Sequence, residues 1–277
     1  MPELPEVEYG RRQLEQTLLA ETLAEVDAPE DSIVFEGVRS AEVVAALRGA
    51  RVLGAHRRGK QLWLSLDRRP WPLFHFGMTG GFVTPDAPGL QLHTGPSLDA
   101  HWPPRFSKLL LTTASGRRLA MTNARRLGRI RLRHDPPSEA PVADLGFDPL
   151  LEPPNGDALH EQLRRRRGVI KSLLLNQRFA AGVGNWVADE VLHAAGIDPR
   201  RVASTLTVED AGRLAWALTD IIKKAVNADA DADRYPKGWL FHQRWRPTEG
   251  MTTATGDPIE LLTVAGRTTV WVPAHQR

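Results

Sequence analysis

The sequence contains no cysteine. Disulfides, thiolate catalysis and every cysteine-based zinc or iron–sulfur site are therefore excluded. The nine histidines are scattered without the spacing of a ligand set, so we predict neither a metal nor any other cofactor. No apolar run approaches the length of a membrane span, and the N-terminus lacks the basic-then-apolar pattern of a signal peptide. We expect an intracellular, monomeric protein with no membrane partner.

Net charge is also small, because 36 basic and 33 acidic side chains leave only +3. Their distribution is uneven. Residues 105–133 contain nine Lys or Arg and no Asp or Glu, and residues 164–178 contain six and none. A single run of this kind is more often a solvated set of arginines. Two such runs favour a positive face that neutralises a phosphate backbone.

The length of 277 residues suffices for two domains with sizeable cores. Residues 4–20 have the apolar spacing of a helix, and six short runs between residues 51 and 134 read as strands. The pattern is helical from about residue 157 to 226, an alanine/aspartate tract at 228–233 predicts a linker, and strand character returns at 259–273. We predict an α+β protein with an N-terminal helix and β-sandwich (1–134), a linker (135–154), a helical domain (155–233) and a C-terminal β-hairpin (234–277).

The N-terminus offers a nucleophile. A small residue after Met1 usually permits removal of the methionine, which would leave Pro2 with a secondary amine of pKa about 8. Glu3 is close enough to move protons for that amine. The plain alternative is a proline that opens a helix with glutamates in its first turn, which is favourable by itself. Spacing alone favours this alternative.

A longer set of motifs resembles the formamidopyrimidine-DNA glycosylase/endonuclease VIII family. The opening MPELPEVE is typical of it, and further matching pieces follow in the family's order along nearly the whole chain. They are RRGKQLWL (57–64), HFGMTG (75–80), NARRLGRI (123–130), LGFDPL (145–150), AGVGNWVADEVLHAAGIDPRR (181–201) and AGRTTVWVPAHQ (265–276). Each piece is weak alone, but the ordered set is specific.

The resemblance implies a catalytic set. Pro2 matches the family's Schiff-base nucleophile and Glu3 its general acid/base. Lys60 matches a lysine that contacts the lesion and assists elimination, although a lysine at the head of a strand is more often plain surface. Glu6 is similar to a family carboxylate near the site. Arg267 matches an arginine that grips the phosphates beside the flipped nucleotide.

The resemblance also implies three side chains that fill the gap left by an everted nucleotide. Met78 and Arg125 match two of them. The third position carries Leu127, where the formamidopyrimidine branch usually has phenylalanine. Leucine supplies apolar bulk between bases but stacks less well. Read without the family, Met78 is equally an ordinary core residue.

Further DNA contacts are implied in the helical domain. The segment after residue 181 resembles the family's helix–two-turn–helix element, where Gly184 and Asn185 with the following helix N-terminus face a phosphate. Lys171 stands where the family has a phosphate-binding lysine, and Arg105 near a DNA-contacting histidine. Glycines before a helix serve packing more often than anion binding.

Most bacterial members carry a four-cysteine zinc finger, which this chain cannot form. The tip motif AGRTTVWVP is nevertheless present, as in plant and fungal relatives that build the hairpin without metal. We expect a zincless finger whose hairpin turns at Ala265–Gly266 and in which Val264, Val270 and Val272 pack in place of metal ligands.

The resemblance therefore implies a base-excision-repair glycosylase and abasic-site lyase that acts on damaged double-stranded DNA. Formamidopyrimidines, and 8-oxoguanine less well because the interval Val226–Trp239 is short, are the expected substrates. Alternatives are an endonuclease VIII-like preference for oxidised pyrimidines, a catalytically silent DNA-binding relative and an RNA- or ribosome-associated protein. We expect the protein with the nucleoid in the cytoplasm of a bacterium or in the nucleus of a eukaryote.

Overall fold

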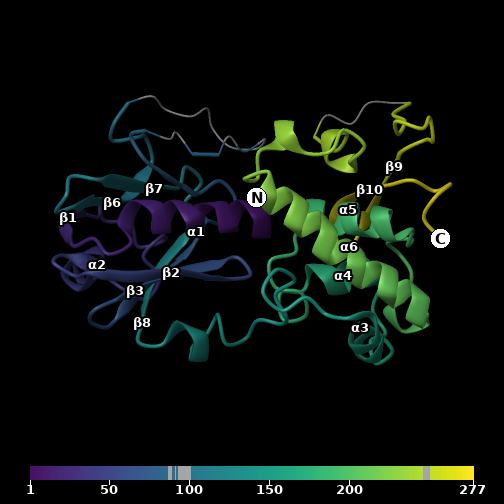
Figure 1. The fold of residues 1–277 in the computed structure, drawn as a ribbon, viewed down its shortest axis with the longest axis horizontal. Helices are drawn as coiled ribbons and strands as arrows, with labels where there is room; N and C mark the ends of the chain where they lie inside the picture. The colour runs from purple at the N-terminus through teal and green to yellow at the C-terminus, as the bar shows by residue number, and fades with distance from the viewer. Residues whose placement is uncertain (87–88, 91, 93–100, 246–249) are drawn as a thin grey trace. The chain divides into compact units, whose positions relative to one another are not determined.

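The protein divides into two compact units, Met1–Asp144 and Leu145–Arg277 (Figure 1). The computed structural model describes residues 1–86, 89–90, 92, 101–245 and 250–277. The boundary between the units falls inside the stretch 135–154, which the sequence predicts as a linker. This stretch is packed rather than free. Val142 is buried with Trp63 and Leu73 of the first unit, and Asp148 is fully buried.

The first unit is a β-sandwich of two four-stranded antiparallel sheets. Across the first sheet the strands follow the order β1 (Leu23–Asp27), β6 (Ser107–Thr113), β7 (Arg118–Thr122) and β5 (Gly81–Val83). Across the second sheet the order is β2 (Val52–Arg58), β3 (Gln61–Leu66), β4 (Trp71–His75) and β8 (Arg129–Arg133). Its helices are α1 (Leu4–Leu18), α2 (Ser40–Leu47) and the short 3-10 helix η1 (Pro136–Ser138). The six strands predicted from the sequence are confirmed. Strands β1 and β5 were not predicted, because neither shows a clear alternation of apolar and polar residues.

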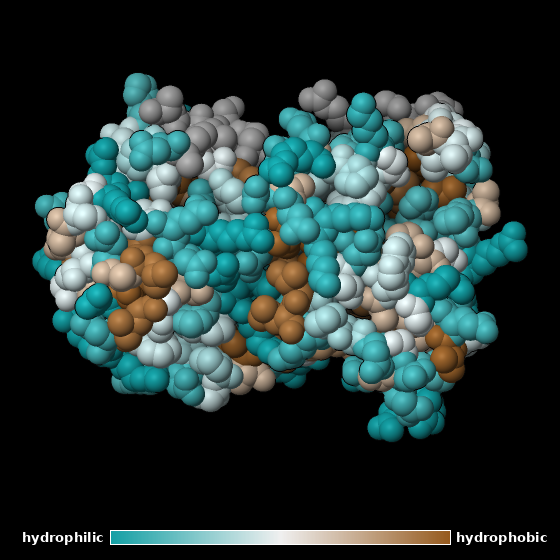
Figure 2. Space-filling model, in the orientation of Figure 1, coloured by the Kyte–Doolittle hydropathy of each residue, from teal (hydrophilic) through white to brown (hydrophobic). Residues whose placement is uncertain are grey.

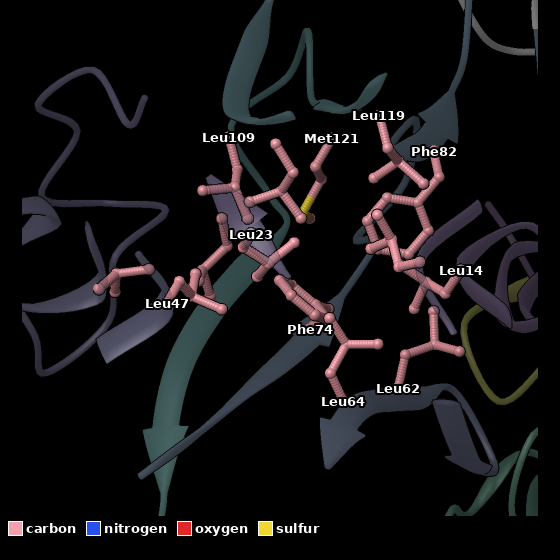
Figure 3. Close-up of a cluster of buried hydrophobic side chains, with 14 of the residues drawn as sticks. Leu14, Leu23, Leu47, Leu62, Leu64, Phe74, Phe82, Leu109, Leu119 and Met121 are labelled. Carbon is pink, nitrogen blue, oxygen red and sulfur yellow. The ribbon is translucent and has the colours of Figure 1, made fainter. Parts of the chain in front are cut away.

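One hydrophobic core lies between the two sheets and is closed by α1. Figure 3 shows its labelled members, which include Leu62, Leu64 and Phe74 from one sheet, Leu23, Phe82, Leu109, Leu119 and Met121 from the other, and Leu14 of α1. Phe74 meets Phe82 edge to face, with ring centroids 5.5 Å apart at 88°. Burial of each such side chain stabilises the fold by about 1.5–3 kcal/mol, so α1 and the residues before it are held on a rigid base.

The second unit is helical and ends in a β-hairpin. Its elements are α3 (Gly156–Leu163), α4 (Ile170–Leu175), α5 (Asn185–Ala195), η2 (Ala203–Thr205), α6 (Val208–Asn227), η3 (Ala232–Arg234), η4 (Leu240–His242), β9 (Glu260–Val264) and β10 (Arg267–Trp271). The long helix α6 begins where the Thr207 hydroxyl accepts the backbone N–H of Asp210 at 3.1 Å. Helix α5 ends at Gly196, whose φ of 68° terminates the helix in the left-handed region.

The hairpin turn is formed by Ala265 and Gly266, with φ of 52° and 70°. Two residues of positive φ match the twist of the flanking strands, so the predicted turn is confirmed. The alanine/aspartate tract 228–233, predicted as a linker, is packed instead. Ala228 and Ala230 are only 8% and 9% exposed, because the chain folds back directly after α6.

The face shown in Figure 2 is largely hydrophilic, with separate hydrophobic patches. Among the residues described, no helix has both the length and the apolar character needed to cross a membrane.

Candidate active site

The first turn of α1 brings Pro2, Glu3 and Glu6 together. Pro2 is buried directly before the helix, and Glu3 is 3% exposed. The backbone N–H of Glu3 donates to Oε2 of Glu6 at 2.9 Å. Carboxylates are favoured here because they oppose the positive end of the helix dipole. The sequence therefore folds its proposed nucleophile and acid/base onto the start of one helix.

Glu6 lies in an apolar setting. Burial, and to a lesser extent the nearby Glu3, raises the pKa of Glu6 from 4.5 to about 7. A carboxyl group with this pKa exchanges a proton at neutral pH. It also lines a cavity of about 350 Å³, whose wall includes Pro2, Tyr9 and Phe76. The cavity belongs to the first unit, and it places open space beside Pro2.

Lys60 lies in the turn between β2 and β3 and is 7% exposed. This turn is tied to α1 by Arg57, whose Nε donates to Oε2 of Glu8 at 2.9 Å and whose Nη1 donates to the carbonyl of Gly59 at 3.2 Å. Arg57 is almost fully buried. A buried guanidinium with both partners in place holds its geometry firmly. The same helix that begins beside Glu3 therefore also fixes the lysine turn.

His75 connects the Lys60 region to the next loop. Burial, and then the positive charge of Lys60, lowers the pKa of His75 to about 4, so its ring is neutral at pH 7. Its Nδ1 accepts the backbone N–H of Gly77 at 3.2 Å. The bond orients the turn that carries Met78, which is half-buried.

Two loops that carry the predicted wedge residues lie against each other. Gly77 has a φ of 63°, and a Cβ at this position would come within 2.3 Å of the Leu127 backbone. Asn123 is fully buried and bridges the loops, since its Nδ2 donates to the Phe76 carbonyl at 2.8 Å and its Oδ1 accepts from the Gly128 N–H at 3.1 Å. Only glycine at position 77 allows so close an approach. The structure thus brings Met78 and Leu127 into adjacent loops.

The second loop is held open to solvent. Arg126 adopts a φ of 54° and forms a forked pair with Asp31, with an Nη2–Oδ1 distance of 2.9 Å. Its neighbours on either side, Arg125 and Leu127, are exposed, and Leu127 is 41% exposed. An exposed leucine between two tethered backbone segments suits insertion into a base stack.

Arg105 also lies in the first unit. It is exposed, its guanidinium lies 5.0 Å from the Phe106 ring, and both residues line the cavity beside Pro2.

In the second unit, the predicted phosphate-binding turn precedes α5. Gly182 has a φ of 93°, and its N–H donates to Oε1 of Gln177 at 2.9 Å. Gly184 is buried at the N-cap of α5. Asn185 begins the helix, but its Nδ2 donates to the Thr268 carbonyl at 2.9 Å. The helix N-terminus is as predicted, while the amide side chain serves a contact to the hairpin.

Lys171 does not have the surface position that a phosphate contact requires. Its side chain is 0% exposed, and its Nζ lies 2.5 Å from Oδ1 of Asp189 and 2.6 Å from Oγ1 of Thr269. The physical reason is that α4 directs this side chain into the interior of the unit, where Asp189 neutralises it. Arg267, by contrast, is exposed at the first position of β10, directly after the turn.

Comparison with known proteins accounts for this arrangement. Residues 1–130 match the formamidopyrimidine-DNA glycosylase N-terminal domain, and residues 145–236 match the formamidopyrimidine-DNA glycosylase H2TH domain. A formamidopyrimidine-DNA glycosylase of Arabidopsis thaliana is 37% identical over 278 residues, covering 100% of this chain and 71% of that protein. The chain belongs to the formamidopyrimidine-DNA glycosylase family.

Solved structures of the family agree with the fold. The MutM (Fpg) protein of Thermus thermophilus superposes with a TM-score of 0.76 at 33% identity, covering 99% of this chain and 98% of that one. A MutM structure in complex with DNA containing carbocyclic 8-oxo-G gives a TM-score of 0.80 at 25% identity, with full coverage of both chains. The α+β fold, with its helix–two-turn–helix unit and hairpin, is thus the family fold.

The sequence did not point to several residues that shape the site. Glu8 with Arg57, and Asn123, brace the catalytic and wedge loops, and Asp189 receives Lys171. All four lie inside the family motifs, which was the available signal, but their roles depend on partners distant in the chain. Within the described ranges, no group of three or more His, Asp or Glu side chains is arranged to hold a metal.

Proposed function

We propose that the protein excises oxidised purines from duplex DNA through the amine of Pro2 and then cleaves the strand. The observation that carries the proposal is the first turn of α1, where Pro2 borders a cavity and Glu3 and Glu6 lie beside it. The names of the relatives, and the 8-oxo-G DNA bound by a MutM structure, support the substrate class.

The chemistry assigns a task to each group. The amine of Pro2 attacks the sugar C1′, the bond from C1′ to the base breaks, and Glu3 supplies the proton that the sugar or leaving base requires. The Pro2 amine loses its proton, the C1′–O4′ bond of the sugar ring then breaks and O4′ takes up a proton. The product is an open-chain iminium between Pro2 and C1′, which is an electron sink. Loss of a proton from C2′ then expels the 3′ phosphate, and a second elimination expels the 5′ phosphate. Lys60 assists the first elimination, and Arg267 holds the phosphates.

Met78, Arg125 and Leu127 complete the proposal, because an everted nucleotide leaves a gap that must be filled. The two adjacent loops offer one half-buried and one exposed apolar side chain, with an exposed arginine two residues before Leu127. Arg125 offers donors to the orphaned base. Such a repair enzyme works where genomic DNA is, in the nucleoid or the nucleus.

The test is covalent trapping. Borohydride should reduce the iminium and leave a protein–DNA adduct that survives denaturing electrophoresis. Mass spectrometry should find Met1 removed and the adduct on the N-terminal peptide. A chain with extra residues before Pro2 should neither trap nor cut, because acylation removes the basic lone pair of the amine. An adduct on Lys60 would reassign the nucleophile, and no adduct on abasic DNA would favour a catalytically silent DNA binder.

We further propose that formamidopyrimidines are better substrates than 8-oxoguanine. The interval after α6 is short and folded onto the unit, with Tyr235 and Trp239 buried and their ring centroids 5.7 Å and 6.2 Å from that of Trp186. Little chain is therefore available to close over an everted base. Single-turnover excision of the two lesions opposite cytosine tests this, and comparable rates would contradict it. A panel of oxidised pyrimidines in the same assay tests the endonuclease VIII-like alternative.

A further inference from the structure

A cluster of charges is buried in the second unit and has no part in the chemistry proposed above. Asp189 of α5 lies between Lys171 of α4 and Arg244, which follows η4. Its Oδ1 is 2.5 Å from Lys171 Nζ, and its Oδ2 is 2.7 Å from Arg244 Nη1. The three side chains are 1%, 0% and 9% exposed. Because burying charges is costly even when they are paired, such clusters are better explained by the geometry they impose than by stability.

The cluster is bonded to strand β10. Lys171 Nζ donates to the hydroxyl of Thr269 at 2.6 Å, and the backbone N–H of Val270 donates to Oδ2 of Asp189 at 3.2 Å. Asn185, at the start of α5, donates to the carbonyl of Thr268 at 2.9 Å. Three consecutive residues of the strand are therefore fixed to two helices, directly after Arg267.

Apolar packing also holds the hairpin in place, among the residues that the structure describes. An isolated two-stranded sheet is marginally stable at best. The apolar cluster around this one is small and consists of Leu240, Met251, Ile259, Val270 and Val272. The chain has no cysteine with which to bind zinc. Apolar packing is non-directional, so directed polar bonds are needed to set the angle at which the turn projects.

The far end of β10 is fastened in the same way. Gln276 is 3% exposed; its Oε1 accepts the N–H of Val272 at 2.8 Å and its Nε2 donates to the carbonyl of Ile197 at 3.0 Å. Ile197 directly follows the end of α5. The chain on both sides of the strand is thus hydrogen-bonded to α5 or to the residues that directly follow it.

We propose that Asp189, together with Lys171 and Arg244, forms a metal-free anchor that positions Arg267. Lys171 is then a positioning residue for strand cleavage and not a phosphate ligand. The proposal rests on the role assigned above to Arg267. It explains why a lysine in a DNA-binding unit is withdrawn from solvent.

The test is a double-mutant cycle on DNA that carries an abasic site. Lys171→Met should slow strand cleavage ten-fold or more in the wild-type background and should cause no further loss in an Arg267→Ala background. Lys224→Met is the matched control, because it removes the same charge from an exposed site that is 52% accessible. It should leave cleavage unchanged. Borohydride trapping at Pro2 should persist in all variants at saturating enzyme.

The salt dependence of DNA affinity distinguishes the two roles of Lys171. A phosphate ligand would lower the slope of log affinity against log salt by about one when removed, whatever residue stands at position 267. If Lys171 only positions Arg267, the double variant Lys171→Met/Arg267→Ala should have the same salt slope as Arg267→Ala alone. A lower affinity and a lower salt slope in the double variant than in Arg267→Ala alone would overturn the proposal.

Amide hydrogen exchange tests the anchor without using activity. Asp189→Asn should accelerate exchange of the Val270 amide ten-fold or more. Thr269→Val removes the two hydrogen bonds of the Thr269 hydroxyl, to Lys171 and to the Arg267 carbonyl, with little change of shape. It should have a smaller effect in the same direction. If Arg267→Ala cleaves DNA normally, the role proposed for Arg267 in strand cleavage is wrong. Exchange of the Val270 amide still tests whether the buried charges hold strand β10. Unchanged Val270 exchange in a folded Asp189→Asn protein would refute the anchor itself.

Discussion

The two units hold their functional side chains by different means. In the first unit, Pro2, Glu3 and Lys60 stand on α1 and on a strand turn over a large apolar core. The buried charges there, such as Glu8 with Arg57, brace that base locally. In the second unit, the hairpin that presents Arg267 has a small apolar cluster and a larger share of buried polar bonds.

The difference follows from size. Two packed sheets bury enough apolar surface to fix strand positions by shape alone. A two-stranded hairpin does not, so its orientation depends on bonds with direction. Substitutions in the first unit should therefore change the rate of base removal. Substitutions in the second unit should change how Arg267 is positioned for its proposed contact with phosphate.

The largest expected effect is that of Glu3→Gln. Loss of the proton-transfer group should slow base removal about 10²–10⁴-fold, while affinity for lesion DNA changes little because phosphate contacts remain. Single-turnover excision and a binding assay check this. Glu15→Gln, at a 44% exposed position on the same helix, is the control. Equal losses of binding and excision would mean that Glu3 is structural.

Arg267→Ala should come next. It should slow strand cleavage on the order of 10²-fold, by loss of a donor to developing phosphate charge, and leave the fold intact because the side chain is exposed. Gel analysis of elimination products and a thermal melt check this. Arg234→Ala, at another exposed arginine of the unit, should be neutral. A lowered melting temperature with unchanged cleavage would contradict the contrast between the two units, because Arg267 would then stabilise the fold and not act on DNA.

Glu6→Gln should change the pH dependence of stability. The pKa of Glu6 is raised to about 7 when folded, against 4.5 unfolded. Its stabilising contribution is therefore complete below pH 4.5 and is lost as the pH rises through 7. Between pH 4.5 and 8, the wild type should lose on the order of 3 kcal/mol more than Glu6→Gln. Denaturant unfolding at both pH values checks this, and parallel curves would contradict the assignment.

A strong chelator should have no effect. With no cysteine available and with the hairpin held by packing and polar bonds, dialysis should leave nicking activity unchanged. A relative that carries the four-cysteine finger is the control that should lose activity. A large loss that zinc restores would overturn the zincless interpretation and, with it, the contrast between the two units.

The distribution of charged residues along the sequence was an incomplete guide to which charges are paired in the folded protein. The run 105–133 contains no acidic residue, yet several of its nine basic side chains pair in the folded protein with a few carboxylates from earlier in the chain. Asp31 pairs with Lys108 and Arg126, and Glu36 pairs with Arg131. Sequence distance does not measure the distance between charges, so an acid-free run is not an unpaired one.

The sequence by itself determined what depends on local pattern. Alternating or apolar runs predicted six of the eight sandwich strands described, the 3.6-residue period predicted every described α-helix except α2, and Ala265–Gly266 marked the hairpin turn. The ordered motifs identified the family, and through that resemblance Pro2 and Glu3 became the proposed catalytic pair. These features are set by neighbouring residues, whose geometry is short-ranged.

Only the tertiary structure decided which side chains are buried and with which partners. In the folded protein, Lys171 is buried against Asp189, and Asn185 donates a hydrogen bond to the hairpin. Burial also raises the pKa of Glu6. Each outcome depends on desolvation and on bonds between residues far apart in the chain, and those energies exist only once the chain has brought the groups together.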